Sequence, residues 1–182
     1  MILPIYLYGA EVLREQARDV EKGEELGTLV ADMWETLGNA EGVGLAAPQI
    51  GKAIRLLIVD GSPLAEDLPD LLDFKRVMIN PVVVEESEET AIYSEGCLSI
   101  PDIHLDVTRP DRIKVKYMNE NFEEVVEEFR EYACRIVQHE MDHLNGVMFV
   151  DRAAPIRRKM IGSKLFNISK GKVRADYKTK LK

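Results

Sequence analysis

Residues 138–143, Gln-His-Glu-Met-Asp-His, contain the residue types that metal-assisted hydrolysis requires. At about 100° per residue of an α-helix, His139 and His143 project roughly 40° apart, so both imidazoles can reach one metal ion. Glu140 lies about a third of a turn away, where it can take a proton from a metal-activated water without being a ligand. The spacing predicts a hydrolytic metal centre on a helix, and the alternative is a helix whose exposed face carries two histidines by chance.

A catalytic site of this type needs a third protein ligand and an open position. No glutamate follows His143 in the sequence, so a third ligand has to come from upstream. Cys97 is the best candidate, because a thiolate is a strong ligand and the flanking Gly96 lets the backbone approach a metal closely. A cysteine alone is more often a small buried apolar residue. Beside the HExxH motif we predict that Cys97 is a ligand, whereas Cys134 points elsewhere on the helix and is assigned to the core.

Residues 42–47, Gly-Val-Gly-Leu-Ala-Ala, loosely match a dinucleotide-binding fingerprint, but the context is wrong. That fingerprint requires a preceding strand and a following helix, whereas here a helical pattern precedes and residues 48–51 lead into a strand. The segment is better interpreted as a glycine-rich strand edge that can pair with an extended peptide. Gln49 at its end can present an amide donor.

The surrounding pattern predicts an α+β fold of mostly antiparallel strands around a central helix that carries HExxH. Helical periodicity covers residues 24–39 and 131–144, and Pro155 fits the first turn of a third helix that ends before Gly171. A surface loop or short helix is expected at 62–73. The β-rich runs are 54–60, 77–85, 90–93, 104–107, 112–118 and 122–129. His104, which alternates with apolar neighbours, is expected to face solvent.

The 182 residues are 46% hydrophobic and 31% charged, which fits one globular domain or a domain with a small appendage. Two cysteines are too few for a disulfide framework, so a reducing compartment is expected. The N-terminus has no basic region before its short apolar stretch, which makes it a poor signal peptide and excludes a membrane span there. These features predict a cytoplasmic protein that does not associate with membranes.

Charge is distributed unevenly along the chain. The net charge of −8 argues against sequence-specific nucleic-acid binding, yet residues 155–182 carry 10 Lys and Arg against one acid, a net +9. Residues 1–154 hold the other 14 bases and 31 acids, a net −17. We therefore expect a catalytic metallohydrolase domain at 1–154 and a basic C-terminal helix and tail at 155–182. The tail could dock on ribosomal RNA or could simply form a solvated face.

Three segments together resemble the signature motifs of the peptide deformylase family. They occur in the family's order, as GVGLAAPQ at 42–49, EGCLS at 95–99 and QHEMDHL at 138–144. The resemblance covers residues 1–150 and weakens after Pro155, where the chain departs from the long C-terminal helix of the best-known bacterial members.

This resemblance implies hydrolysis of the formyl group from formyl-methionine at the N-termini of nascent polypeptides, with release of formate. It implies Glu140 as the catalytic acid and base, and Fe(II) as the native ion, with Zn(II), Ni(II) or Co(II) able to replace it. By the same resemblance Arg109 is the structural partner of Glu95. The implied metal ligands are Cys97, His139 and His143.

Substrate binding requires donors for the formyl oxygen and an apolar pocket for the methionine side chain. The Gln49 amide and the Leu98 backbone N–H are the expected donors. Motif proximity and helix phase select the expected substrate-binding residues, which are Val43, Gly44, Tyr93 and Ile136.

Two other functions share part of this pattern. A zinc endopeptidase of the HExxH type has the same metal and base, but the chain lacks the downstream ligand that such enzymes use. A structural or regulatory metal protein would close its site with four protein ligands, whereas this pattern leaves one position open beside Glu140 and Gln49.

Overall fold

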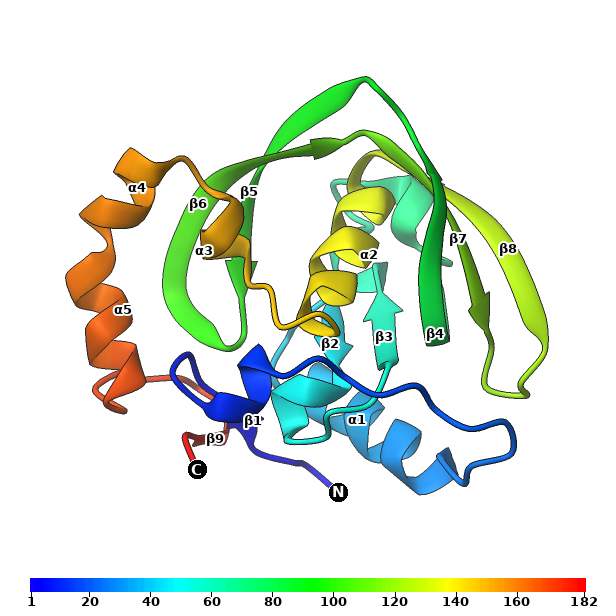
Figure 1. Ribbon diagram of the computed structural model, residues 1–182, viewed down its shortest axis with the longest axis horizontal. Helices are drawn as coiled ribbons and strands as arrows, with labels where there is room; N and C mark the ends of the chain where they lie inside the picture. The colour runs from blue at the N-terminus through cyan, green and yellow to red at the C-terminus, as the bar shows by residue number, and fades with distance from the viewer.

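The computed structural model describes all 182 residues, and its largest element is a five-stranded antiparallel sheet in the order β2-β3-β4-β7-β8 (Figure 1). Burial alternates along β7, so that Ile113, Val115 and Tyr117 face the core. β2 pairs only with β3 and is therefore an edge strand. The strands are β2 (Gly44–Ala46), β3 (Leu56–Asp60), β4 (Lys75–Glu86), β7 (Arg112–Met118) and β8 (Glu124–Arg130).

A second antiparallel sheet is the hairpin of β5 (Thr90–Cys97) and β6 (Ile100–Pro110). Cys97 lies opposite Ile100, so Leu98 and Ser99 form a two-residue turn. The register shifts between Glu95 and Cys97, as at a β-bulge. The predicted metal ligand Cys97 is therefore the last residue of β5, next to a tight turn.

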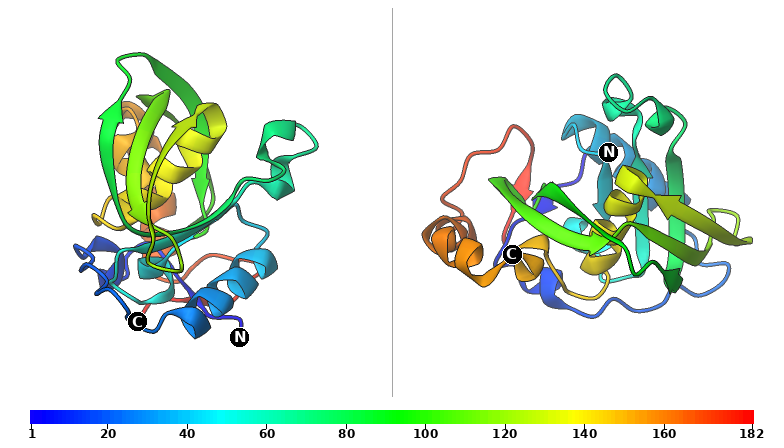
Figure 2. Two further views of the ribbon diagram at one scale, coloured as in Figure 1. Left: turned by 90° about the vertical axis from the view of Figure 1, so that its right-hand side faces the viewer. Right: turned by 90° about the horizontal axis from the view of Figure 1, so that it is seen from above.

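The helix α2 (Glu131–His143) lies between the β5–β6 hairpin and the strands β7 and β8, as Figures 1 and 2 show. All ten residues from Cys134 to His143 are buried, although more than half of them are polar. Burying polar groups is unfavourable unless they have partners, so this helix must obtain them from the strands around it. The predicted α+β architecture around a central HExxH helix is confirmed.

The helix α1 (Gly27–Asn39) packs Val30, Met33 and Leu37 against β2 and β3, in agreement with the predicted helix at 24–39. Short 3-10 helices complete this part of the chain. They span Glu11–Arg14, Ala47–Ile50, Ser62–Leu64 and Pro69–Leu71. The last two lie in the segment 62–73 for which a loop or short helix was expected.

The C-terminal part differs from the single helix expected after Pro155. After α3 (Phe149–Arg152), the chain forms α4 (Pro155–Met160) and α5 (Gly162–Ser169), with Ile161 outside the α conformation between them. The change of direction brings Leu165 and Ile168 into the same core cluster as Phe149. One continuous helix was therefore wrong, because burial of these side chains favours a break.

The two ends of the chain pair with each other. β9 (Thr179–Lys180) runs parallel to β1 (Ile5–Tyr6), and they form a small separate sheet (Figure 1). Leu181 packs on the core cluster that contains Leu165. No helix has the combination of length and apolar character that crossing a bilayer requires.

Candidate active site

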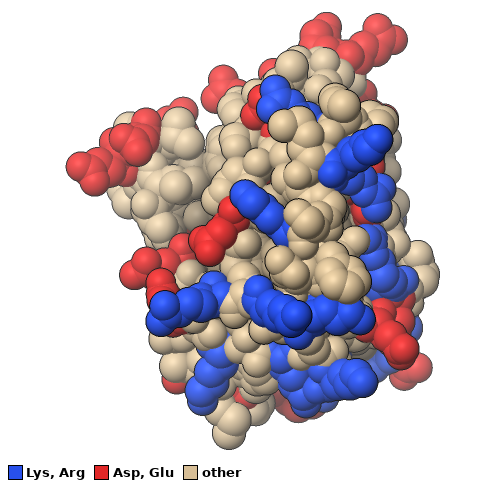
Figure 3. Space-filling model, turned by 90° about the vertical axis from the view of Figure 1, so that its left-hand side faces the viewer, with Lys and Arg blue, Asp and Glu red and all other residues tan.

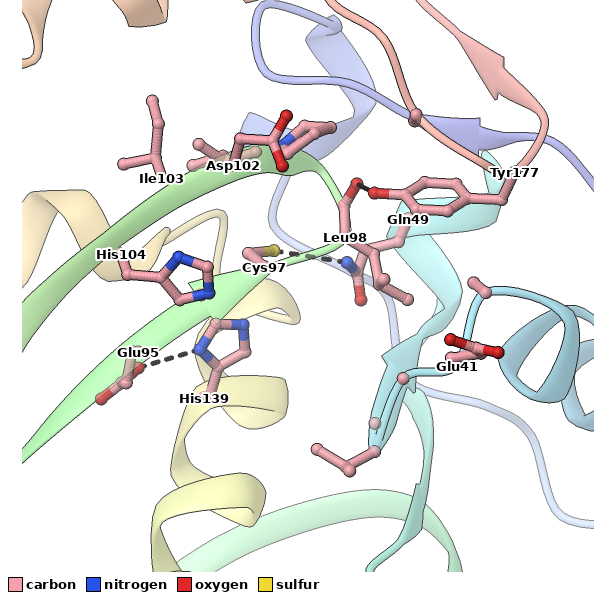
Figure 4. Close-up of a pocket in the computed structure, with 18 of the residues that line it drawn as sticks. Glu41, Gln49, Glu95, Cys97, Leu98, Asp102, Ile103, His104, His139 and Tyr177 are labelled. Carbon is pink, nitrogen blue, oxygen red and sulfur yellow. Dashed lines mark hydrogen bonds and ion pairs between the residues drawn. The ribbon is translucent and has the colours of Figure 1, made fainter. Parts of the chain in front are cut away.

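A cavity of about 780 Å³ opens between α2, the β2 segment, the β5–β6 turn and the C-terminal tail. The tail contributes residues 174–177 to its lining. Residues 39–44, which lead into β2, form another part, and the hairpin contributes residues 94–98 and 100–104. Polar side chains converge on it from different elements (Figure 4). The segments that carry the three sequence motifs, which are far apart in the chain, therefore meet at one place.

Cys97, His139 and His143 bring their ligand atoms together within 4.8 Å of one another. The Cys97 Sγ is 3.4 Å from the His143 Nε2. Burial, and then the neighbouring His139, lower the pKa of His143, so that its ring stays neutral and able to ligate. One thiolate and two imidazoles form a donor set that suits a divalent ion such as zinc or iron, and three protein ligands leave a position open. The residues present fit a catalytic metal.

Glu95 orients the His139 ring through a hydrogen bond to its Nδ1. Its Oε1 is 2.9 Å from the His139 Nδ1, which leaves the Nε2 free for the ligand cluster. Arg109 binds both oxygens of Glu95, at 2.8 and 2.9 Å, as the family resemblance implies. Arg135, which the sequence did not single out, donates to Glu95 at 2.7 Å. Against the effect of burial, hydrogen bonds with His139 and Arg109 hold the pKa of Glu95 far below its usual range.

Asp142 extends this buried network beyond Glu95. Arg109 donates to its Oδ2 at 2.8 Å, and Arg152 from α3 binds both of its oxygens at 2.5 and 2.7 Å. Asp142 is therefore a structural residue of the HExxH helix. Buried charges of opposite sign compensate each other here, which explains how a largely polar helix tolerates the interior.

Glu140 is buried beside the ligand cluster, and its Oε2 has no hydrogen-bond partner. Burial raises the pKa of Glu140 to about 7, with Glu95 adding to the rise and His139 opposing it. A carboxyl group with a pKa near neutrality can both accept and donate a proton at working pH. Its environment therefore suits an acid/base role.

Gly44 gives Glu140 the space that it occupies. A Cβ at position 44 would lie 2.6 Å from the Glu140 Oε1 and 2.8 Å from its Cδ. Any larger residue in this strand edge would force the carboxylate to move. The first motif therefore contributes close packing against the third.

We expect Gly44→Ala to keep its metal but to lower kcat roughly a hundredfold, because the carboxylate is displaced by about the width of a bond. Steady-state kinetics with metal quantification measure both effects. Gly38→Ala is the matched control, since a Cβ there meets nothing within 4 Å and should leave kcat unchanged. Normal turnover by Gly44→Ala would contradict this role.

Gln49 is held in one orientation by its own hydrogen bonds. Its Oε1 accepts from the Ala46 N–H at 3.0 Å, which turns the Nε2 toward the cavity. The Nε2 donates to the Ser99 Oγ at 3.1 Å and lies 3.5 Å from the Cys97 Sγ. The amide donor expected from the sequence is therefore beside the ligand cluster.

Leu98, the other expected donor, follows Cys97 in the hairpin turn and lines the cavity. Its backbone N–H makes no hydrogen bond with any protein group, whereas its carbonyl oxygen accepts from the Tyr177 hydroxyl at 2.7 Å. A free N–H next to a metal ligand is available for an oxygen atom of the substrate.

Of the expected substrate-binding residues, Val43, Gly44 and Ile136 line the cavity, and Tyr93 does not. The Tyr93 ring instead packs edge-to-face against Tyr132, with 5.5 Å between ring centroids, and it is Tyr132 that lines the cavity. Proximity to the EGCLS motif was the only basis for Tyr93, and the register shift between Glu95 and Cys97 interrupts the alternation that would place Tyr93 and Cys97 on one face. Arg135, Arg174 and Tyr177 also line the cavity, although the sequence did not single them out. His104 is exposed, as expected, but it also lines the cavity.

The sequence model of the polypeptide deformylase family matches residues 2–159. The chain belongs to the peptide deformylase family. It is 44% identical to a peptide deformylase of Christiangramia forsetii over 186 aligned residues, covering 98% of this chain and 95% of that one. A peptide deformylase of Prosthecochloris aestuarii is 46% identical, with 97% and 94% covered.

Solved structures agree with the sequence relatives. The peptide deformylase of Thermus thermophilus superposes with a TM-score of 0.83 at 37% identity, covering 94% of this chain and all of that one. A class I type b enzyme from Acinetobacter baumannii, solved with Met-Ala-Ser bound, gives 0.76 at 38% identity, with 84% and 98% covered. Peptide deformylases are metal-dependent hydrolases that act on formyl-methionine at the N-termini of nascent polypeptides, and this function is therefore that of the chain. The HExxH endopeptidase alternative is not supported.

Proposed function

We propose that Cys97, His139 and His143 hold the metal of this deformylase and that Glu140 is its catalytic acid and base. The convergence of the three ligand atoms within 4.8 Å, with the unpartnered Glu140 carboxyl beside them, is the observation that carries the proposal. A divalent ion bound there supplies Lewis-acid activation of water and of the formyl carbonyl.

Glu140 takes a proton from the attacking water and later passes it to the leaving amine. Its raised pKa, near 7, suits both transfers. Negative charge that develops on the formyl oxygen meets the Gln49 amide and the Leu98 N–H, two donors that are fixed before substrate binds. Fixed donors contribute without reorganising during the reaction, so these two residues complete the catalytic group.

The formyl-methionine substrate is proposed to bind along the edge of β2, with its side chain against Val43 and Ile136. The outer edge of β2 is not paired with another strand, so it can bind an extended peptide through backbone hydrogen bonds. Gly44 gives that peptide room to approach. The Acinetobacter baumannii enzyme, which has a similar fold, was solved with Met-Ala-Ser bound, and this supports a peptide that begins with methionine as the ligand.

Fe(II) is the proposed native ion. The mixed sulfur and nitrogen donor set suits Fe(II), Zn(II), Ni(II) or Co(II), and the family resemblance favours iron among them. Free Cys97 and Cys134, together with nascent chains as substrates, support action in the reducing cytoplasm.

Formate release from a formyl-Met peptide tests this assignment, using protein purified without oxygen and analysed for metals. We expect one equivalent of metal, mainly iron. The catalytic efficiency should be roughly thirtyfold lower with a formyl-Gly peptide, because an empty pocket loses about 2 kcal/mol of apolar burial. Equal efficiency on both peptides would remove the methionine pocket, and zinc as the bound metal would reject iron.

Residues 155–182 are proposed to dock the enzyme on the ribosome, while residues 1–154 supply the ligands and the base. All ten Lys and Arg residues of this segment are exposed, and Figure 3 shows many Lys and Arg side chains on the side of the molecule that carries α4 and α5. Ile156, Met160 and Phe166 are exposed among them, at 59 to 70% of their surface. A basic face with apolar side chains suits a surface that presents RNA phosphates.

The triple variant Lys159→Glu, Lys164→Glu and Lys170→Glu reverses three of these charges. Its affinity for ribosomes at low salt, measured by co-sedimentation, should fall at least tenfold, because about three phosphate contacts are lost. Turnover of a short formyl-Met peptide should not change, because none of the three lines the cavity. The control reverses an equal number of charges elsewhere, at Lys22, Lys52 and Lys116. Equal co-sedimentation of both triple variants would exclude docking through this segment.

A further inference from the structure

The C-terminal tail forms one wall of the active-site cavity. Residues 174–177 line it, and β9, which begins at Thr179, pairs with β1. Within this wall Tyr177 is half-buried and packs on the core cluster that also contacts Leu98. Figure 4 shows its hydroxyl directed at the Leu98 carbonyl, where the hydrogen bond measures 2.7 Å.

The turn that carries Leu98 is held from several sides. The Tyr8 N–H donates to the Ser99 carbonyl at 2.8 Å, and Gln49 donates to the Ser99 Oγ. The Leu98 carbonyl is held by Tyr177. Tyr8 follows β1 and Tyr177 precedes β9, so both contacts come from residues that flank the small sheet joining the two ends of the chain.

These contacts leave the Leu98 N–H without a protein partner. The other contacts of the turn are made to Ser99, so the Tyr177 hydroxyl is the side-chain donor that holds the Leu98 carbonyl itself. Without it the Leu98–Ser99 peptide would have more freedom to tilt, and this would also tilt the preceding peptide, which carries the N–H. A donor acts well on developing charge only when its direction is fixed beforehand. Burial, and then the Cys97 thiol, raise the pKa of Tyr177, so its hydroxyl keeps the proton that it donates.

We infer that Tyr177 is a positioning residue for deformylation, acting through Leu98 by fixing the turn whose N–H faces the formyl oxygen. The inference rests on the proposed role of Leu98 and adds to it a residue from the tail. It predicts an effect on the chemical step rather than on binding or folding.

Tyr177→Phe removes the hydroxyl and keeps the ring in the cavity wall. We expect kcat for a formyl-Met peptide to fall roughly three- to tenfold, as for loss of one supporting hydrogen bond. KM should stay within about twofold, with metal content and Tm unchanged. Tyr6→Phe is the control, since Tyr6 lies in the same terminal sheet but does not line the cavity, and its kinetics should match the wild type.

Unchanged kcat in Tyr177→Phe, or a change confined to KM, would overturn the inference and reduce Tyr177 to a part of the wall. Gln49→Leu, measured in parallel, separates this result from failure of the proposal that Gln49 and Leu98 donate hydrogen bonds to the formyl oxygen. A lowered kcat in Gln49→Leu together with a normal kcat in Tyr177→Phe would reject the role of Tyr177 alone. Normal kcat in both variants rejects the donor assignment together with the inference.

Discussion

Glu140→Gln should bind a full equivalent of metal and hydrolyse formyl-Met peptides roughly a thousandfold more slowly than the wild type. The amide has the size of the carboxylate, so the cavity and the contact with Gly44 are kept, but it cannot accept the proton of the attacking water. Because Glu140 is not among the three clustered ligands, the metal has no reason to leave. Metal analysis and single-turnover formate release measure the two properties separately.

The matched control for this variant is Glu131→Gln, the same change at the exposed first residue of the same helix. It should leave both metal and turnover as they are. Loss of metal from Glu140→Gln would mean that the carboxylate is a ligand, and the acid/base assignment would then be wrong.

Cys97→Ala should have the opposite signature, losing metal first and activity as a consequence. Loss of a residue that only supports a ligand typically lowers metal affinity ten- to hundredfold. Loss of one of the three ligands themselves should lower it by more. Titration of the metal-depleted protein with Zn(II) or Ni(II) gives the affinity directly. The loss of activity should be partly reversible at high metal concentration, which a folding defect would not allow.

Cys134→Ala provides the comparison, because Cys134 is buried in the core within α2 and is not one of the clustered ligands. It should keep metal and turnover and lose about 1 kcal/mol of stability from the small cavity left behind. A Cys97 variant that kept both metal and normal turnover would eliminate the three-ligand site.

Local pattern was enough to predict much of the fold. β7 lies at 112–118 as predicted, because its alternation of apolar and polar residues is a property of the strand alone. β6 is longer than the predicted run of 104–107, extending from Ile100 to Pro110, since pairing with β5 continues the strand through residues with weak propensity. β9 has no apolar pattern of its own and exists because β1 lies beside it.

In the site, too, some residues follow from local pattern and others depend on contacts between elements. The ligand positions and Glu140 follow from spacing within one helix and from one short motif. Arg135 and Tyr177 reach the site through contacts between elements, and nothing in their own segments indicates them. Tyr93 was selected for its proximity in sequence to Cys97, but the β-bulge between Glu95 and Cys97 interrupts the two-residue alternation that would put both side chains on one face, and nothing in the sequence indicates that bulge.

The pairing of β1 with β9 fixes the order in which the molecule can be completed during its own synthesis. At about 5–20 residues per second, Ile5 is made roughly 9–35 s before Thr179, its partner. Over that interval β1 has no strand to pair with, and the cavity lacks the wall that residues 174–177 provide. A chain whose synthesis has not yet passed Thr179 therefore cannot have a finished active site. Each copy becomes a complete deformylase only after β9, which is made last, pairs with β1, which is made first.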